Sequence, residues 1–304
     1  MNSNTKSVLL ASVAVLSWST VATAFKVALS HLTYFEMLLV ACVAALCIFT
    51  VWITIERKWA DVRRLTGRLW VTLALLGLLN PVAYYLVLFK SYSFLPAQVA
   101  QPVNYLWPIV LLVLLAVFDK KPIAPRKYIG MAVSLGGLTL ISLGGKEIEG
   151  GISIEGIGLA AMSALLWASY WMFNNKLKER VDECVSLFVG FLFGTIYLVI
   201  MTSFMPVDNL GSVSGLLSGI YVGCFEIGIP FICFGLAIRL TSNPALINQM
   251  CYLAPFLSLF FISMVLRESI VPTTYVGLLL IVSGIVYNQY FAERRRVERH
   301  SAQI

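Results

Sequence analysis

Residues 34–55 read YFEMLLVACVAALCIFTVWITI, an unbroken run in which Glu36 is the one charged side chain. A helix needs about 20 apolar residues to cross a bilayer core about 30 Å thick. The rest of the chain has the same character, because 59% of its 304 residues are hydrophobic and 12% are charged. An ordinary soluble domain carries about 25% charged residues. The sequence therefore predicts a membrane-spanning helix here, with lipid as part of the solvent.

On both sides of this run, similar apolar runs recur with short polar connections between them. Their lengths fit a bilayer crossing, and they cover residues 7–29, 34–55, 69–90, 96–118, 127–144, 155–174, 184–204, 215–238, 243–266 and 272–291. We expect the first run to stay in the mature protein, because it is too long for a signal peptide and no small-residue cleavage site follows it. The predicted fold class is all-α integral membrane, with ten transmembrane helices.

The basic residues between these runs predict the orientation of the helices. With a cytoplasmic N-terminus, 18 of the 22 lysines and arginines fall on the cytoplasmic side, which is the bias that sets membrane topology. We expect a multi-pass protein of the cell inner (plasma) membrane with both termini in the cytoplasm and residues 294–304 as a basic cytoplasmic tail. The net charge of +7 then reflects orientation and the anionic leaflet, and it predicts no nucleic-acid partner.

The two halves of the chain resemble each other at a nearly constant offset. The matches at 147 residues are Pro108 with Pro255, Pro125 with Pro272, Tyr128 with Tyr275, Gly130 with Gly277 and Gly137 with Gly284, and at 148 to 149 residues Pro96-Ala97 with Pro244-Ala245 and Trp18 with Trp167. Five helices are an odd number, so the second copy enters the membrane from the opposite side. We predict two inverted five-helix repeats, residues 1–145 and 150–293, which is a transporter design with a site near the bilayer midplane.

Few residue patterns suited to cofactor or covalent chemistry are present. The six cysteines form no CxxC pair, and His31 and His300 lie outside the apolar runs. No HExxH, P-loop or GxGxxG pattern occurs. We expect no metal site, no cofactor and no catalytic residue. An intramembrane enzyme would need a nucleophile–base pair or paired carboxylates in the membrane, and this sequence offers one deep carboxylate.

That carboxylate is Glu226, near the middle of the eighth run. Gly219, Gly223 and Pro230 share its helix face. A charged group in hydrocarbon is expensive unless it is paired or hydrated, so such residues often mark a substrate or ion pathway. Glu226 is therefore predicted to bind a substrate ammonium or to take up a proton as the coupling group. The structural alternative is a protonated Glu226 that bonds neighbouring helices.

Two further charges flank the first outer loop, Lys26 and Glu36. Lys26 is about one turn from its helix end and can extend outward along its apolar stem. A surface ion pair or a simple orientation charge explains both residues. The alternative is a cation at the outer mouth that attracts a carboxylate.

Four spans carry stripes that combine aromatic rings, amides and often proline at helical spacing. They are Trp167, Tyr170, Trp171 and Asn174; Gln101, Asn104 and Pro108, with Trp107 beside them; Asn80, Pro81 and Tyr84; and Asn248, Tyr252 and Pro255. Aromatic stripes commonly pack helices or mark the membrane interface. Proline, however, leaves a backbone carbonyl without its helical donor, and that carbonyl needs another partner. The stripes therefore favour the lining of a wet cavity over helix packing.

Two of these stretches carry a family resemblance, Val103-Asn104-Tyr105-Leu106-Trp107-Pro108 and Leu166-Trp167-Ala168-Ser169-Tyr170. With the ten runs and the repeat, the whole chain resembles the EamA-type drug/metabolite transporter superfamily, and these strings resemble its YddG-type aromatic amino acid exporters. The resemblance implies that Asn104, Tyr105, Trp107 and Trp167 line a central cavity with Tyr252 opposite. The full candidate substrate-binding set is Trp18, Asn80, Tyr84, Gln101, Asn104, Tyr105, Trp107, Trp167, Tyr170, Trp171, Glu226, Gln249 and Tyr252.

The leading functional hypothesis is a secondary transporter of small metabolites, with amino acids or related amphipathic compounds as substrates and alternating access as the mechanism. Export is implied by the resemblance. Its partners are a small-molecule substrate, the lipid bilayer and, through Glu226, protons; the sequence does not fix the oligomeric state. One alternative is transport of anionic phosphorylated or nucleotide-type solutes, which needs deep basic residues. Another is a receptor or scaffold that transports nothing.

Overall fold

A computed structural model describes residues 3–120, 123–144 and 152–301. Within these ranges the regular structure is helical throughout. The N-terminal half contains α1 (Ser3–Leu29), α2 (Tyr34–Ile55), α3 (Trp59–Arg63), α4 (Gly67–Gly77), η1 (Leu78–Ala83), α5 (Tyr84–Phe94), α6 (Ala97–Asn104), α7 (Trp107–Phe118) and α8 (Lys127–Gly144). The C-terminal half contains α9 (Ile154–Leu177), α10 (Glu183–Met201), α11 (Val213–Val222), η3 (Gly223–Gly228), α12 (Ile229–Leu240), α13 (Pro244–Met250), α14 (Leu253–Phe261), η4 (Ile262–Leu266) and α15 (Pro272–Ser301).

Eight helical segments of the described chain are long and apolar enough to cross a membrane. They begin and end close to predicted runs one to four and six to nine. The two segments that correspond to the third and eighth predicted runs are 28 residues long, Gly67–Phe94 and Val213–Leu240. The fifth run contains a shorter apolar stretch, Lys127–Ile141, and the tenth lies in α15. The structure therefore agrees with an all-α membrane fold, and the number of ten membrane crossings stays a prediction.

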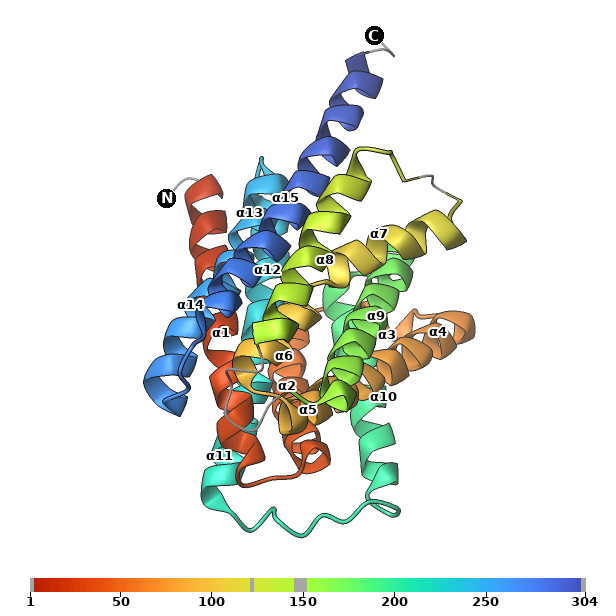
Figure 1. Cartoon of the computed structure of the whole chain (residues 1–304). Helices are drawn as coiled ribbons and strands as arrows, with labels where there is room; N and C mark the ends of the chain where they lie inside the picture. The colour runs from red at the N-terminus through yellow and green to blue at the C-terminus, as the bar shows by residue number, and fades with distance from the viewer. Residues whose placement is uncertain (1–2, 121–122, 145–151, 302–304) are drawn as a thin grey trace.

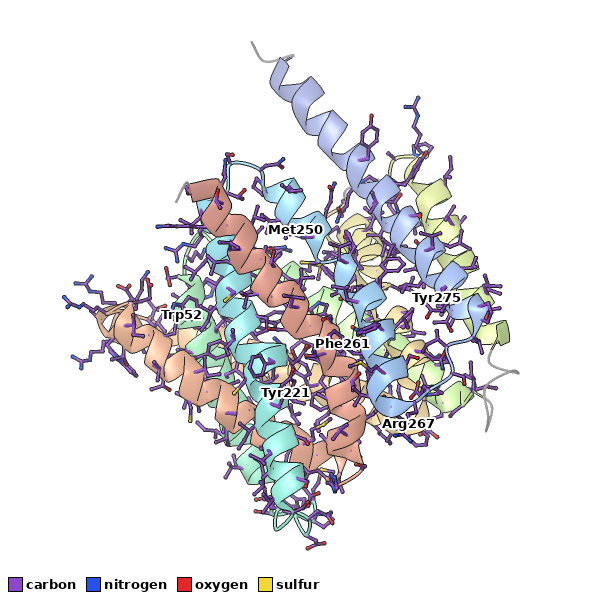
Figure 2. The ribbon with its side chains drawn as sticks, turned by 90° about the vertical axis from the view of Figure 1, so that its left-hand side faces the viewer. Trp52, Tyr221, Met250, Phe261, Arg267 and Tyr275 are labelled. Carbon is purple, nitrogen blue, oxygen red and sulfur yellow. The ribbon has the colours of Figure 1, made fainter. Side chains whose placement is uncertain are left out.

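Both ends of the chain lie on the same side of the molecule, at the top of Figure 1, and the connection between α10 and α11 lies on the opposite side. We call these the terminal side and the loop side. Figure 2 shows Met250 near the terminal side and Arg267 farther toward the loop side, so the segment between them runs from one toward the other. An even number of crossings places both ends on one side.

Local sequence signals explain where several helices begin. Thr33 caps α2 in a reciprocal pattern, because its side chain accepts from the Glu36 backbone N–H while the Glu36 carboxylate accepts from the Thr33 N–H. Ser153, Asp182 and Ser212 cap α9, α10 and α11 in the same way with one side-chain bond each. These caps satisfy backbone donors that would otherwise be unpaired at the membrane boundary.

The two repeats are interleaved. α1 belongs to the first repeat but packs mainly against α12, α14 and α11 of the second, and α9 packs mainly against α5, α7 and α6 of the first. Hydrogen bonds fix α1 in this place, since the Ser7 hydroxyl donates to the Ala237 carbonyl at 2.7 Å and the Thr20 and Tyr221 hydroxyls are 2.7 Å apart. The first helix of each repeat is thus exchanged into the other.

The last helices of the two repeats, α8 and α15, form the most extensive helix pair. Gly130 lies against the Gly284 carbonyl, and Gly137 lies against the Gly277 carbonyl; a Cβ at either position would come within 2.5 Å of that oxygen. Small residues permit this approach of two backbones. The contacts are reciprocal, because the repeat matches Gly130 with Gly277 and Gly137 with Gly284. This is the pattern that a two-fold relation between antiparallel helices produces.

Candidate functional site

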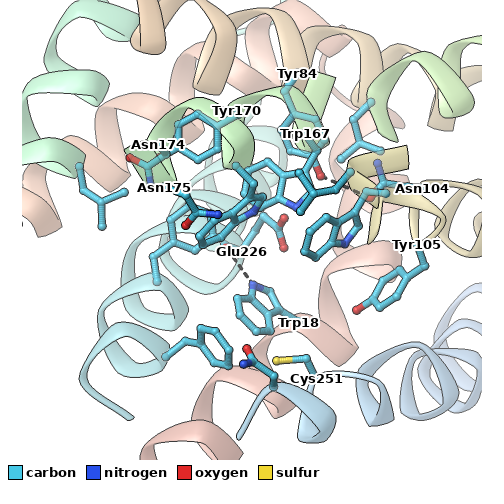
Figure 3. A pocket seen from close by; sticks show the side chains of 18 of the residues that line it. Trp18, Tyr84, Asn104, Tyr105, Trp167, Tyr170, Asn174, Asn175, Glu226 and Cys251 are labelled. Carbon is cyan, nitrogen blue, oxygen red and sulfur yellow. Dashed lines mark hydrogen bonds between the residues drawn. The ribbon is translucent and has the colours of Figure 1, made fainter. Parts of the chain in front are cut away.

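A cavity of about 490 Å³ lies between the two halves of the molecule. Its volume is within the range of small-molecule sites. The structure brings eleven of the thirteen predicted site residues to its lining: Trp18, Tyr84, Gln101, Asn104, Tyr105, Trp107, Trp167, Tyr170, Trp171, Glu226 and Tyr252. Figure 3 shows ten of the lining side chains by label, with the Glu226 carboxylate among the tryptophans.

Glu226 lies in η3, where the eighth predicted run departs from regular α-helix. The residue is 9% exposed, and the Tyr85 hydroxyl donates to its Oε1 at 3.2 Å. Its Oε2 accepts no hydrogen bond from the side chains and backbone that the structure describes. One carboxylate oxygen is thus held by the protein, and the other is available to a ligand, a proton or water.

The backbone of Glu226 is also held from across the repeat boundary. In a regular helix its carbonyl would accept from the N–H of residue 230, but that residue is Pro230, which has no N–H. The Trp18 indole Nε1 donates to this carbonyl instead, at 3.1 Å. Figure 3 shows this bond as a dashed line. The proline thus removes a helical donor, and a cavity-lining tryptophan of α1 supplies another.

Stacked aromatic rings form one wall of the cavity. Trp167 stacks on Tyr84 with centroids 4.6 Å apart and on Tyr170 at 5.5 Å. Trp107 and Trp171 stack at 6.3 Å, and Trp107 meets Trp167 edge to face at 6.5 Å. Offset-stacked and edge-to-face pairs are the favoured aromatic arrangements. The wall therefore offers large, rigid, apolar surfaces with electron-rich faces.

The amide of Asn104 is oriented within this wall. Its Nδ2 donates to the Ser163 hydroxyl at 2.8 Å, and its Oδ1 accepts from the Tyr84 hydroxyl at 3.4 Å. These partners come from α9 and α5, so the amide joins three helices at the cavity. The NYLWP string lies at this wall, at the junction where α6 ends at Asn104 and α7 begins at Trp107.

Two buried polar atoms of lining residues have no hydrogen-bond partner in the described structure, Gln101 Oε1 and Trp171 Nε1. Gln101 is 6% exposed. Buried polar groups normally find a partner, and those that do not point to water or a ligand. Both atoms are buried in this conformation, so neither is presented to a ligand in the cavity.

The cavity opens on the terminal side. Its lining there includes polar and charged residues at the α9–α10 connection, namely Asn174, Asn175, Lys178, Glu183 and Ser186. Asn175 and Lys178 are exposed. The Lys178 ammonium lies 5.3 Å from the centroid of the Trp171 ring, a distance at which a cation–π contact forms. Charged residues therefore mark the mouth.

The loop side is closed by hydrogen bonds between elements of both repeats. The Lys26 ammonium donates to the carbonyls of Tyr92 and Leu95 at 3.0 and 3.1 Å. Beside it, Gln98 is 2% exposed and bonds to three residues of the η4–α15 connection and the start of α15, Ser269, Val271 and Thr274. We call this group the loop-side seal: Lys26, Tyr92, Leu95, Gln98, Ser269, Val271 and Thr274. Tyr92, Phe25 and Leu88 form the buried floor of the cavity above it.

The geometry bears on the two alternatives for Lys26 and Glu36. No bond joins these residues, because both Glu36 oxygens accept from other groups: Oε1 accepts from the Asn209 backbone N–H at 2.7 Å, and Oε2 accepts from Thr33 and from the Asn209 side chain. Glu36 is fully buried. A surface ion pair between Lys26 and Glu36 is therefore absent from the described structure. Lys26 serves the seal, and Glu36 anchors the connection between α10 and α11.

Two predicted site residues lie outside the cavity lining, Asn80 and Gln249. The prediction for Asn80 assumed a continuous helix that carries it on the face of Tyr84. Asn80 instead has non-helical dihedral angles, φ −142° and ψ 116°, and is 2% exposed. Gln249 is exposed on α13, and its neighbours Asn248, Cys251 and Tyr252 line the cavity in its place. The role of these two residues in binding stays a prediction that this geometry does not support.

Several lining residues were missed because only the tertiary structure brings them in. Phe231 and Phe234 follow Pro230 and belong to a plain apolar run, and Gln289 follows Asn288 near the middle of α15. The Gln289 amide donates to the Tyr252 hydroxyl, a pairing between separate spans that no local sequence signal shows. No group of three or more metal-ligating side chains occurs among the described residues.

Comparison with known proteins agrees with the two-repeat fold. Two segments, residues 5–143 and 154–288, each match the model of the EamA-like transporter family. A solved crystal structure is similar at a TM-score of 0.67 over 95% of this chain and 98% of that chain; at 20% identity this shows the fold alone.

The curated relatives are distant. An uncharacterised transporter, YvbV of Bacillus subtilis, is 24% identical over 71% of this chain and 70% of its own length. The aromatic amino acid exporter YddG of Ancylobacter novellus is 25% identical over 58% of this chain and 61% of its length. Protein PecM of Dickeya dadantii is 22% identical over 76% and 78%.

Proposed function

The chain belongs to the EamA-like transporter family, and from this premise we propose that it is a secondary transporter that exports amino acids or related amphipathic compounds. Membership makes it a multi-pass membrane protein with a small-molecule substrate, and its relatives are transporters, not enzymes. The substrate class, the direction and the mechanism are the proposal. A relative that is an aromatic amino acid exporter supports the class.

One observation carries the mechanism: the central cavity is open on the terminal side and sealed on the loop side. Alternating access requires such a site, reached from one side at a time. The seal joins α1, α5 and α6 to the start of α15 and the connection before it, so it can open only if these elements separate. The mouth at the α9–α10 connection then closes.

The membrane arrangement follows the charge bias of the sequence. We place the terminal side in the cytoplasm of a bacterial-type inner membrane, because 18 of 22 basic residues then face inward. α8 and α15 complete ten crossings, residues 1–145 and 150–293 form the two inverted repeats, and residues 294–304 form a basic tail at the inner leaflet. The described state is then open to the cytoplasm.

Glu226 is the proposed coupling group. It is the one carboxylate deep in the described cavity, and Lys178 and Glu183 lie at its mouth. A carboxylate that holds a proton has no charge with which to bind an ammonium, so proton and substrate compete for it. Such competition links substrate movement one way to proton movement the other way.

The alternative substrates receive less support. An anionic phosphorylated or nucleotide-type solute needs basic residues around its phosphates, and Lys178 is the one basic residue in the described lining. A receptor or scaffold that moves no solute would leave the open-and-sealed cavity unexplained. The flux experiment below separates these possibilities.

The proposal is tested by flux from proteoliposomes loaded with labelled amino acids and amines. We expect saturable efflux that Leu111→Trp abolishes, because Leu111 lines the cavity and a larger ring would fill it. Val113→Trp on the same helix is the matched control, since Val113 is 38% exposed and lies outside the lining. Efflux no faster than from empty liposomes for every compound would refute transport of this class.

A further inference from the structure

We infer that the central cavity selects compounds with a net positive charge, an ammonium group on a flat apolar body and no carboxylate, over zwitterionic amino acids. This inference rests on the proposed function and narrows its substrate class. It starts from the charges of the described lining, which are Glu226 in the interior and Lys178 and Glu183 at the mouth. The interior thus holds one negative group and no positive one.

Glu226 presents its free side to the cavity. Tyr85 occupies Oε1, and Oε2 has no donor from the described residues. An ammonium carries three N–H donors and no acceptor, so it needs acceptors in its surroundings. Glu226 Oε2 is such an acceptor in the lining. Charge-assisted bonds to a carboxylate are among the stronger ones available.

The aromatic residues around Glu226 suit a cation as well. Figure 3 shows the carboxylate between Trp18 and Trp167, and Phe231 lies 6.0 Å from Trp167, centroid to centroid. The faces of aromatic rings attract cations within about 6 Å, most strongly for tryptophan. An alkyl or aryl body would occupy the stacked wall of Trp107, Trp167 and Trp171.

A substrate carboxylate finds no comparable partner in the interior. In an amino acid the carboxylate is attached to the carbon that bears the ammonium, so binding the ammonium to Glu226 brings two negative groups close together, which is unfavourable in a partly desolvated site. Lys178 is exposed, and its ammonium already lies over the Trp171 ring.

The test compares three probes that share one phenyl body: phenethylamine, phenylalanine and 3-phenylpropionate. Binding to the purified wild-type protein is measured by titration calorimetry, and flux by proteoliposome efflux. We expect phenethylamine to bind at least about tenfold more tightly than phenylalanine, and 3-phenylpropionate to bind more weakly than both. Equal or tighter binding of phenylalanine would overturn the inference, and because this comparison uses the wild type it does not depend on any variant folding.

Three variants locate the effect. Glu226→Gln should weaken phenethylamine binding at least about tenfold, whereas Glu155→Gln, an exposed residue outside the lining, should not change it. Lys178→Gln should leave the order of the three probes unchanged. A tenfold loss of phenylalanine binding in Lys178→Gln would instead assign Lys178 to a carboxylate and overturn the inference.

The outcomes separate this inference from the proposed function. Saturable efflux of phenylalanine without a preference for phenethylamine refutes the selection of cations and leaves the transporter intact. Efflux no faster than from empty liposomes for all three probes and for every other compound tested refutes the transporter itself. Binding and efflux that favour phenethylamine, and that Glu226→Gln abolishes, support both the selection of cations and the transporter assignment.

Discussion

The third and eighth spans are both broken by a proline, and the two breaks meet different surroundings. The offset that matches Trp18 with Trp167 also matches Pro81 with Pro230 and Gly77 with Glu226. A proline has no N–H to donate to the carbonyl four residues earlier. Pro81 therefore leaves the Gly77 carbonyl without its helical donor in the third span, and Pro230 does the same to the Glu226 carbonyl in the eighth. The same local chemistry thus arises twice.

The Pro81 break lies in dry contact with α10. A Cβ at Gly77 would lie 2.4 Å from the Gly190 carbonyl, and a Cβ at Gly194 would lie 2.5 Å from Pro81. Glycine here permits a close approach of two helices. The Pro230 break lies at the cavity, where the carboxylate of Glu226 faces the interior. There the Trp18 indole N–H donates to the Glu226 backbone carbonyl. A duplicated fold therefore holds its charged group in one copy and uses the other copy for packing.

The largest expected effect is on the cavity side of this contrast. Glu226→Gln keeps the size of the side chain and an acceptor for Tyr85 but removes the charge. We expect proteoliposome flux of the cationic substrate to fall about a hundredfold, which corresponds to about 2.7 kcal/mol. Size-exclusion chromatography and thermal stability serve as the folding control. Flux at the wild-type level would place the functional group elsewhere.

The second effect concerns packing at the Pro81 break. Gly77→Ala should lower the free energy of unfolding by about 1–3 kcal/mol, the usual range for overpacking, because its Cβ meets a backbone oxygen that cannot move alone. Gly190→Ala is the matched control on α10, since a Cβ there meets nothing within 4 Å. Thermal denaturation in detergent measures both. Equal stability of the two variants would show that this break is not tightly packed.

The third effect tests the substitute donor at the Pro230 break. Trp18→Phe leaves the Glu226 carbonyl without its partner and should lower stability by about 1–2 kcal/mol. Trp167→Phe is the control from the other repeat, because its indole N–H makes no hydrogen bond in the described structure and it loses only ring area. A larger loss for Trp167→Phe would contradict the role assigned to the Trp18 bond.

The smallest effect concerns the salt bridge that holds α10, the helix on which the Pro81 break rests. Lys58 donates to Asp182 at 2.5 Å, and both side chains are partly exposed. Such pairs contribute below about 1 kcal/mol. The hydrogen bond to Asp182 raises the pKa of Lys58, so its stabilisation is complete below the ordinary lysine pKa of about 10.4 and is lost as the pH rises through the raised value.

A double-mutant cycle of Lys58→Met and Asp182→Asn measures this term. We expect a small coupling energy that does not change between pH 7 and pH 9. A coupling energy above 2 kcal/mol, or one that fades within that pH range, would contradict this description.

Apolar runs predicted most of the helices well, since this signal acts within a few residues. The same local logic identified the prolines of the stripes, Pro81 among them, as sites of freed carbonyls, and it placed Pro230 on the helix face of Glu226. It could not identify their partners, because Trp18 is 208 residues from Glu226 in the chain. Asn80 was misplaced for a related reason: helical spacing holds only while the helix continues, and the backbone leaves helical geometry at that residue.

The cavity wall was predictable because tryptophans and amides are rare in lipid-facing positions at depth. Its mouth was not, since Lys178 and Glu183 resemble ordinary charges at helix ends. Only the packing of α9 and α10 against the rest of the molecule makes them part of the site.

The exchange of α1 and α9 has a mechanical consequence. α1 is bonded to α12 by Ser7 and to η3 by Trp18, and the next helix, α2, also packs mainly against elements of the second repeat, α10, η3 and α11. A rocking motion that preserves these bonds moves α1 with helices of the second repeat. Such a motion divides the molecule by its packing and not by the order of the repeats along the chain.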